Sequence, residues 1–125
     1  LGPETLLKWG MGLGLLASFL IVIGVGPSEL LWLSLGLVFS VGNLAYALLQ
    51  SNYGPELAGR VNTALNLMVF LGAFLIQWGF GASVDALRAA GYATANAYQI
   101  TFAGLLALQA AGWLWFLASG RIRQK

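Results

Sequence analysis

The sequence predicts an all-α membrane protein whose four transmembrane helices form antiparallel hairpins. Of the 125 residues, 59% are hydrophobic and only 8% are charged, whereas about a quarter are charged in ordinary soluble domains. The six basic and four acidic residues divide the chain into four long uncharged runs, 9–28, 30–55, 61–84 and 89–120. A spanning helix needs about 20 apolar residues, so each run can hold one.

The first two spans are predicted at residues 5–25 and 28–50. The first ends at the Gly26-Pro27 turn, after which Ser28 is a candidate helix N-cap. The turn between the spans is short, so the two helices must run antiparallel. The second span ends at 51–55, where adjacent glycine and proline residues break the helix.

The last two spans are predicted at residues 57–84 and 95–119. Pro55 suits a first helical turn because its missing N–H would have no partner there, and Glu56 complements the positive end of the helix dipole. Between these spans, residues 85–96 form the most polar connection of the chain.

The basic residues indicate an orientation. Four spans place both termini and the 51–55 loop on one side of the membrane. Five of the six basic residues fall on that side, and only Arg88 falls on the other. Because cytoplasmic loops carry an excess of lysine and arginine, we expect both ends to be cytoplasmic. The five are Lys8, Arg60, Arg121, Arg123 and Lys125.

The composition argues against several functional classes. The chain contains no cysteine and no histidine, and it shows no paired carboxylates, activated nucleophile or phosphate-binding loop. We therefore expect no enzyme activity, no bound metal and no cofactor. The net charge of +2 comes largely from the C-terminal tail, which favours the lipid bilayer over nucleic acid as the partner.

Small residues four positions apart mark candidate packing faces, because lipid offers no hydrophobic drive between helices and close contact relies on small side chains. Such spacing occurs in the first, second and fourth spans. The residues are Gly10 and Gly14, Gly36 and Ser40, and Ala103, Ala107 and Ala111.

Polar side chains inside the spans concentrate in the second and third. Asn43, Tyr46 and Gln50 share one helical face, which either lines a pathway or forms interhelical hydrogen bonds. Asn62 and Asn66, four residues apart, favour packing between helices. Gln77 lies deeper in its span and is a candidate for a cavity or a domain interface. No ionisable residue lies in the middle of any predicted span.

The stretch 54–66 resembles the loop and helix start between the tenth and eleventh helices of major facilitator superfamily transporters. A Pro-Glu-x-x-Gly-Arg turn is common there, and Pro55, Glu56, Gly59 and Arg60 match it. The continuation through 70–85 is similar to the eleventh helix of bacterial members. Together these matches cover about thirty residues, and the order of spans and loops suits helices nine to twelve.

The resemblance implies that residues 1–125 are a partial transporter domain. The second span would line a cavity and the third would lie at the interface with the N-terminal half, which agrees with their polar faces. The partners would be the remaining helices of a parent carrier in a bacterial inner membrane and a small solute of unknown identity. Such carriers work by alternating access between two bundles.

A complete small four-helix membrane protein is the alternative, either a self-assembling exporter or an anchor or assembly subunit. Small multidrug exporters resemble the chain in span count but use a membrane-embedded glutamate in the first helix, which 5–25 lacks. An anchor subunit would be expected to present an apolar partner face without polar residues clustered in particular helices.

Overall fold

A computed structural model describes the backbone of residues 2–122 and the side chains as far as Ser119. The predicted fold class is confirmed: the described part is all helical, and four of its helical segments are long and apolar enough to cross a membrane. The second segment joins three elements into one span over Ser28–Gln50. The elements are α1 (Pro3–Ile23), α2 (Ser28–Phe39), the 3₁₀ turn η1 (Ser40–Asn43), α3 (Leu44–Gln50), α4 (Pro55–Ala89) and α5 (Thr94–Ile122).

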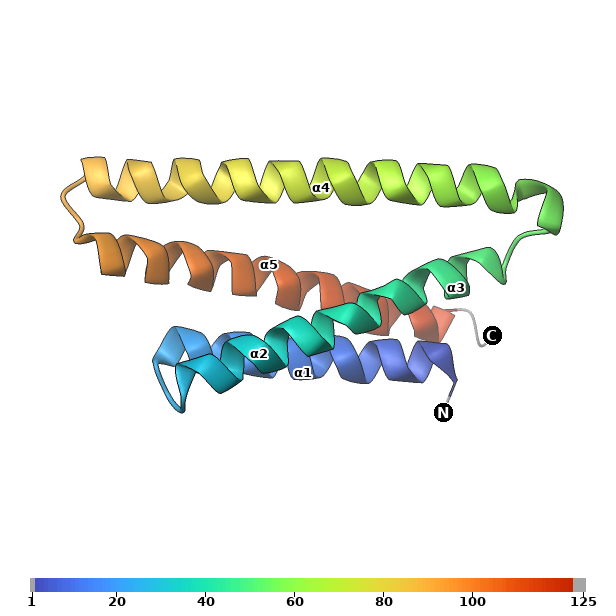
Figure 1. Cartoon of the computed structure of the whole chain (residues 1–125), viewed down its shortest axis with the longest axis horizontal. Helices are drawn as coiled ribbons and strands as arrows, with labels where there is room; N and C mark the ends of the chain where they lie inside the picture. Colours follow the sequence, from blue (N-terminus) through green and yellow to red (C-terminus); the bar gives the residue numbers. More distant parts are fainter. Residues whose placement is uncertain (1, 123–125) are drawn as a thin grey trace.

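The helices run antiparallel (Figure 1). The start of α1, the end of α5 and the α3–α4 connection lie at one end of the molecule. The α1–α2 turn and the α4–α5 connection lie at the other. In the described part, α1 packs against the second span and α5, whereas α4 contacts only α3 and α5. α4 therefore stands away from α1 and α2.

Two glycines end helices by the same arrangement. Gly24 has φ +69°, and the amides of Gly24 and Val25 donate to Ile21 and Leu20 at the end of α1. Gly91 has φ +94°, and the amides of Gly91 and Tyr92 donate to carbonyls of the last turn of α4. Because a left-handed residue suits glycine, both helices end in Schellman motifs.

The structure differs from the expected boundary between the last two spans. α4 continues to Ala89, five residues past the expected end at Val84. Asp85 is charged but does not break a helix, and Arg88 in the last turn complements the helix dipole. The helix persists until the backbone can reverse at Gly91, so the polar connection is shorter than expected.

The start of α2 also differs from expectation. Pro27 occupies the N-cap position and Ser28 is already helical, without a side-chain capping hydrogen bond. The start of α4 is the expected one, since Pro55 lies in its first turn after Gly54. The basic tail used to infer orientation, Arg121, Arg123 and Lys125, lies outside the described side chains.

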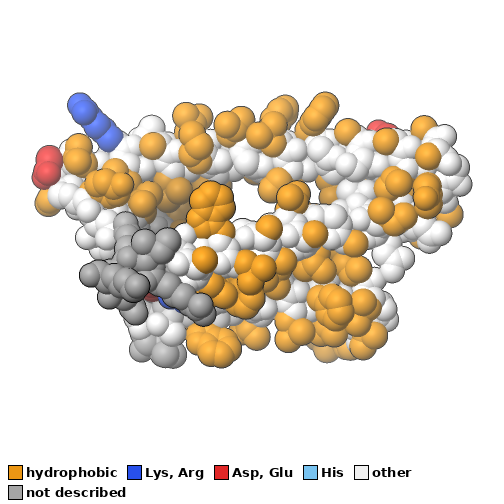
Figure 2. Space-filling model, turned by 180° about the vertical axis from the view of Figure 1, so that it is seen from behind, with side chains coloured by type: hydrophobic (Ala, Val, Ile, Leu, Met, Phe, Trp, Pro, Cys, Tyr) orange, Lys and Arg blue, Asp and Glu red, His pale blue; other side chains and the backbone are white. Residues whose placement is uncertain are grey.

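The chain exposes far more apolar surface than a folded water-soluble protein of its size. Its accessible surface is 8935 Å², against about 6,400 Å² for a folded soluble protein of this mass. Large side chains such as Phe70 and Trp115 are 73% and 76% exposed. In Figure 2 apolar side chains are spread along the whole visible face, and charged ones appear only near the two ends. Such a surface suits hydrocarbon.

Candidate functional site

Two side-chain hydrogen bonds join α3 to α4 near their connection. The Tyr46 hydroxyl donates to Asn66 Oδ1 at 2.6 Å, and Gln50 Nε2 donates to Asn62 Oδ1 at 3.1 Å. Four residues separate the partners on each helix, and the helices run in opposite directions, so the two bonds are successive rungs of one ladder. The polar faces of the second and third spans therefore meet at this end.

The groups in the ladder are all neutral, which suits a site close to hydrocarbon because no charge has to leave water. Tyr46, Gln50 and Asn62 are half-buried, and Asn66 is exposed. Interhelical hydrogen bonds of this kind are worth about 0.6 kcal/mol on average in membranes, and up to about 1.7 kcal/mol. The ladder holds α3 against α4, where α4 has no contact with α1 or α2.

Asn43 and Gln77 do not join this ladder. Both side chains are exposed, and neither has a hydrogen-bond partner among the described residues. Asn43 lies about 10 Å along the helix from Gln50, and Gln77 lies about 18 Å from the end of α4 at Ala89. Two unpaired amides therefore reach the surface well inside their spans.

Gln77 lies three turns along α4 from Asn66, on nearly the same flank of the helix. The ladder does not extend to it because the second span and α4 diverge away from their connection (Figure 1). The structure thus separates the sequence candidates into two groups. The side chains of Tyr46, Asn62 and Asn66 form interhelical hydrogen bonds, whereas those of Asn43 and Gln77 are exposed without one.

The second span tightens into the 3₁₀ turn η1 at Ser40–Asn43, and the candidate Asn43 is its last residue. The Ser40 hydroxyl donates to the Leu37 carbonyl at 2.6 Å. A short 3₁₀ segment inside a helix often marks a hinge or a strained sequence. It lies between α2, which packs against α1, and α3, which packs against both α1 and α4.

The α3–α4 connection contains the turn motif. Pro55 opens α4, and the Glu56 carboxylate folds back toward Gly54, where an added Cβ would collide with it. Gly59 has open space where a Cβ would be, and the Arg60 side chain is exposed. The arrangement places an acidic group at a helix N-terminus, where the dipole stabilises it.

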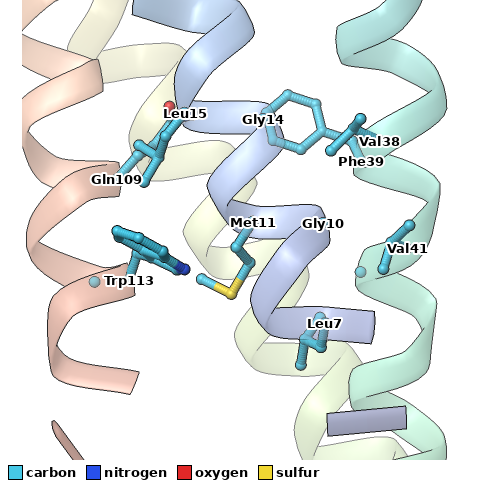
Figure 3. A pocket seen from close by; sticks show the side chains of 12 residues that line it. Leu7, Gly10, Met11, Gly14, Leu15, Val38, Phe39, Val41, Gln109 and Trp113 are labelled. Carbon is cyan, nitrogen blue, oxygen red and sulfur yellow. The ribbon is translucent and has the colours of Figure 1, made fainter. Parts of the chain in front are cut away.

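Gly10 and Gly14 lie where α1 packs against the second span. A Cβ at Gly10 would be 2.8 Å from Val41 Cγ1, and one at Gly14 would be 3.3 Å from Val38 Cγ1. Figure 3 shows both glycines beside a cavity of about 250 Å³ between α1, the second span and α5. Glycine is needed at Gly10 because the Val41 side chain occupies the space that a larger residue would need.

The other small-residue stripes lie in more open surroundings. A Cβ added at Gly36 would have nothing within 4 Å of it, and Ser40 is exposed. On α5, Ala103 is half-buried while Ala107 and Ala111 are exposed. The side of α5 that contacts α1 instead carries Trp113. This side lies roughly a third of a turn around the helix from the alanine stripe.

Two interhelical contacts use acceptors that the sequence does not reveal. Gln99 Nε2 donates to the Val22 carbonyl at 2.7 Å, and Trp113 Nε1 donates to the Lys8 carbonyl at 3.1 Å. Both tie α5 to α1. The acceptors are backbone carbonyls, which every helical residue has, so the sequence does not single them out. The sequence shows only that Gln99 and Trp113 are polar donors within a span.

The fold and these contacts define a membrane-embedded α-helical protein with four spans. Its interhelical hydrogen bonds between the described residues join neutral groups. In residues 2–122 no group of three or more metal-ligating side chains comes together. No family model, curated protein or solved structure matches the chain.

Proposed function

We propose that the chain is the C-terminal part of a secondary active transporter, corresponding to helices nine to twelve of a major facilitator carrier. It would move a small solute across a bacterial inner membrane by alternating access. The observation that carries the proposal is the exposure of two unpaired amides, Asn43 and Gln77, well inside spans that are otherwise apolar.

An amide facing lipid is costly, because an unsatisfied polar group in hydrocarbon loses several kcal/mol of hydrogen bonding with water. Asn43 and Gln77 would avoid this cost by lining a wet cavity or by meeting polar groups of further helices. Either role supports a bundle larger than the four helices described. The separation of α4 from α1 and α2 points the same way.

Within this proposal the second span lines the solute pathway, and α4 lies at the interface with the N-terminal bundle. Asn43, Tyr46 and Gln77 contact solute or that interface, and the 3₁₀ turn η1 allows the second span to bend. The α3–α4 connection, with Pro55, Glu56, Gly59 and Arg60, faces the cytoplasm. The resemblance of 54–66 to the corresponding loop of major facilitator carriers supports this assignment.

The direct test is the reading frame that encodes the chain. The proposal expects about eight further hydrophobic spans upstream of Leu1. An initiation codon at Leu1 without such spans would refute it and would favour a complete four-helix protein, either a self-assembling exporter or an anchor subunit.

A second test uses uptake by the parent carrier. Asn43→Ala and Gln77→Ala should each impair uptake without reducing membrane insertion. Asn96→Ala is the matched control, because it removes an exposed amide from the first turn of α5 outside the proposed pathway. If both variants transport as well as the control, neither residue belongs to the pathway.

A further inference from the structure

A second cavity lies at the end of the molecule opposite the α3–α4 ladder. Its volume is about 340 Å³, and α1, α2, α4 and α5 all contribute to its wall. Four of its lining side chains are aromatic, namely Trp32, Phe80, Tyr98 and Phe102. We call this space the aromatic cavity.

The four rings form two tilted pairs around the aromatic cavity. The ring centroids of Trp32 and Phe102 are 5.6 Å apart with an interplanar angle of 51°, and those of Phe80 and Tyr98 are 6.0 Å apart at 50°. Each pair joins one ring of α5 to a ring of another helix. Trp32 and Tyr98 remain 52% and 53% exposed, so contact within the pairs does not cover them.

The polar groups at the aromatic cavity favour a positive ligand. Gln99 lines it, and because its Nε2 donates to the Val22 carbonyl at 2.7 Å, its Oε1 is left as an acceptor. Glu29 lies one turn before Trp32 on α2. Among the described residues no cationic side chain lines the cavity, and Arg88 lies two turns beyond Phe80 on α4.

We propose that the aromatic cavity binds a small organic cation of the quaternary ammonium type. The negative faces of aromatic rings attract such cations, most strongly at tryptophan, and several rings together form the cages that recognise choline and methylated lysine. Glu29, one helical turn from Trp32, adds a negative charge at this end of the molecule. The proposal is independent of the proposed transport function, since it rests on a different end of the molecule and on different residues.

The test is calorimetric titration of the purified full chain in maltoside micelles, which contain no ammonium group. The probes are choline and 3,3-dimethylbutan-1-ol, which has nearly the same shape without the charge. Choline should bind saturably and about tenfold or more tightly than the alcohol, because the cation–π attraction acts on choline alone. Adding a short-chain phosphatidylcholine then distinguishes the source of the ligand: competition assigns the site to lipid headgroups, and no competition assigns it to free solutes.

Variants separate binding from packing. Trp32→Leu and Phe102→Leu keep an apolar side chain but remove the ring, and each should weaken choline binding about five- to thirtyfold. Trp115→Leu is the matched control, because Trp115 is 76% exposed on α5 and lies outside the cavity. Glu29→Gln should weaken binding of choline severalfold at low salt and leave the alcohol unaffected.

Far-UV circular dichroism checks that each variant keeps its helices. Because Glu29→Gln removes a charge from an exposed residue and disturbs no ring contact, it still tests the proposal if a leucine variant fails to fold. Equal affinity for choline and the neutral alcohol would overturn the proposal. So would the absence of choline binding, or an equal loss in Trp32→Leu and Trp115→Leu.

Discussion

Replacing Gly10 with alanine should weaken the packing of α1 against the second span. The new Cβ would lie 2.8 Å from Val41 Cγ1 and 3.1 Å from Val41 Cβ, whereas unstrained carbon atoms stay about 3.5–4.0 Å apart. The two helices must therefore separate by roughly 0.7 Å or more, or Val41 must leave its preferred rotamer. Overpacking of this size typically costs about 1–3 kcal/mol.

Gly36→Ala provides the matched control. Both glycines lie inside helices, so both substitutions gain the same helix propensity, which is up to about 1 kcal/mol. Gly36 has nothing within 4 Å of the added Cβ, so only Gly10→Ala suffers the collision. The difference between the two variants should therefore be about 1–3 kcal/mol, with Gly36→Ala the more stable.

The assay is reversible unfolding in mixed micelles, in which the mole fraction of dodecyl sulfate is raised and helicity is followed by circular dichroism. Val41→Ala in the Gly10→Ala background should recover part of the loss, because it removes the Cγ atom that collides. A Gly10→Ala protein as stable as Gly36→Ala would refute the close approach of α1 and η1. Failure of Val41→Ala to rescue would assign the loss to another contact.

Three further predictions follow from the structure. Tyr46→Phe and Asn66→Ala, combined in a double-mutant cycle, should show a coupling of about 0.6–1.7 kcal/mol in the same unfolding assay, and zero coupling would remove the first rung of the ladder. Ser18 is fully buried with its Oγ unpartnered, so Ser18→Ala should leave stability unchanged or raise it by up to about 3 kcal/mol; a clear loss would mean that the hydroxyl is bonded. Gly91→Ala should destabilise by about 1–2 kcal/mol because Gly91 has φ +94° and alanine is strained there, and a neutral effect would argue against that backbone conformation.

The four spans could be predicted because charge placement alone delimits them. Glu29, Arg60 and Asp85 interrupt the apolar sequence at intervals that match a bilayer. Helix ends were less predictable, because a charge marks the edge of hydrocarbon but does not end a helix. α4 therefore runs past Asp85 to Ala89 and stops only where Gly91 permits a left-handed residue.

The polar site could be predicted only in part. Spacing alone placed Tyr46 with Gln50 and Asn62 with Asn66 on common faces, but the register between α3 and α4 depends on the conformation of the connecting turn, which no periodicity reveals. The contacts of Gln99 and Trp113 with α1 use backbone carbonyls and leave no pattern in the sequence. The aromatic cavity could not be predicted because its rings come from three helices whose packing no sequence spacing reveals.

The side of the membrane on which each connection lies provides the sharpest test of four crossings. The chain contains no cysteine, so Ser28→Cys, Ser51→Cys and Ala90→Cys each introduce a unique thiol at a helix connection. A membrane-impermeant maleimide should label the first and third from outside in bacterial spheroplasts, and Ser51→Cys only in inverted vesicles. Labelling of all three from the same side would contradict four membrane crossings, and with them the proposed fold and function.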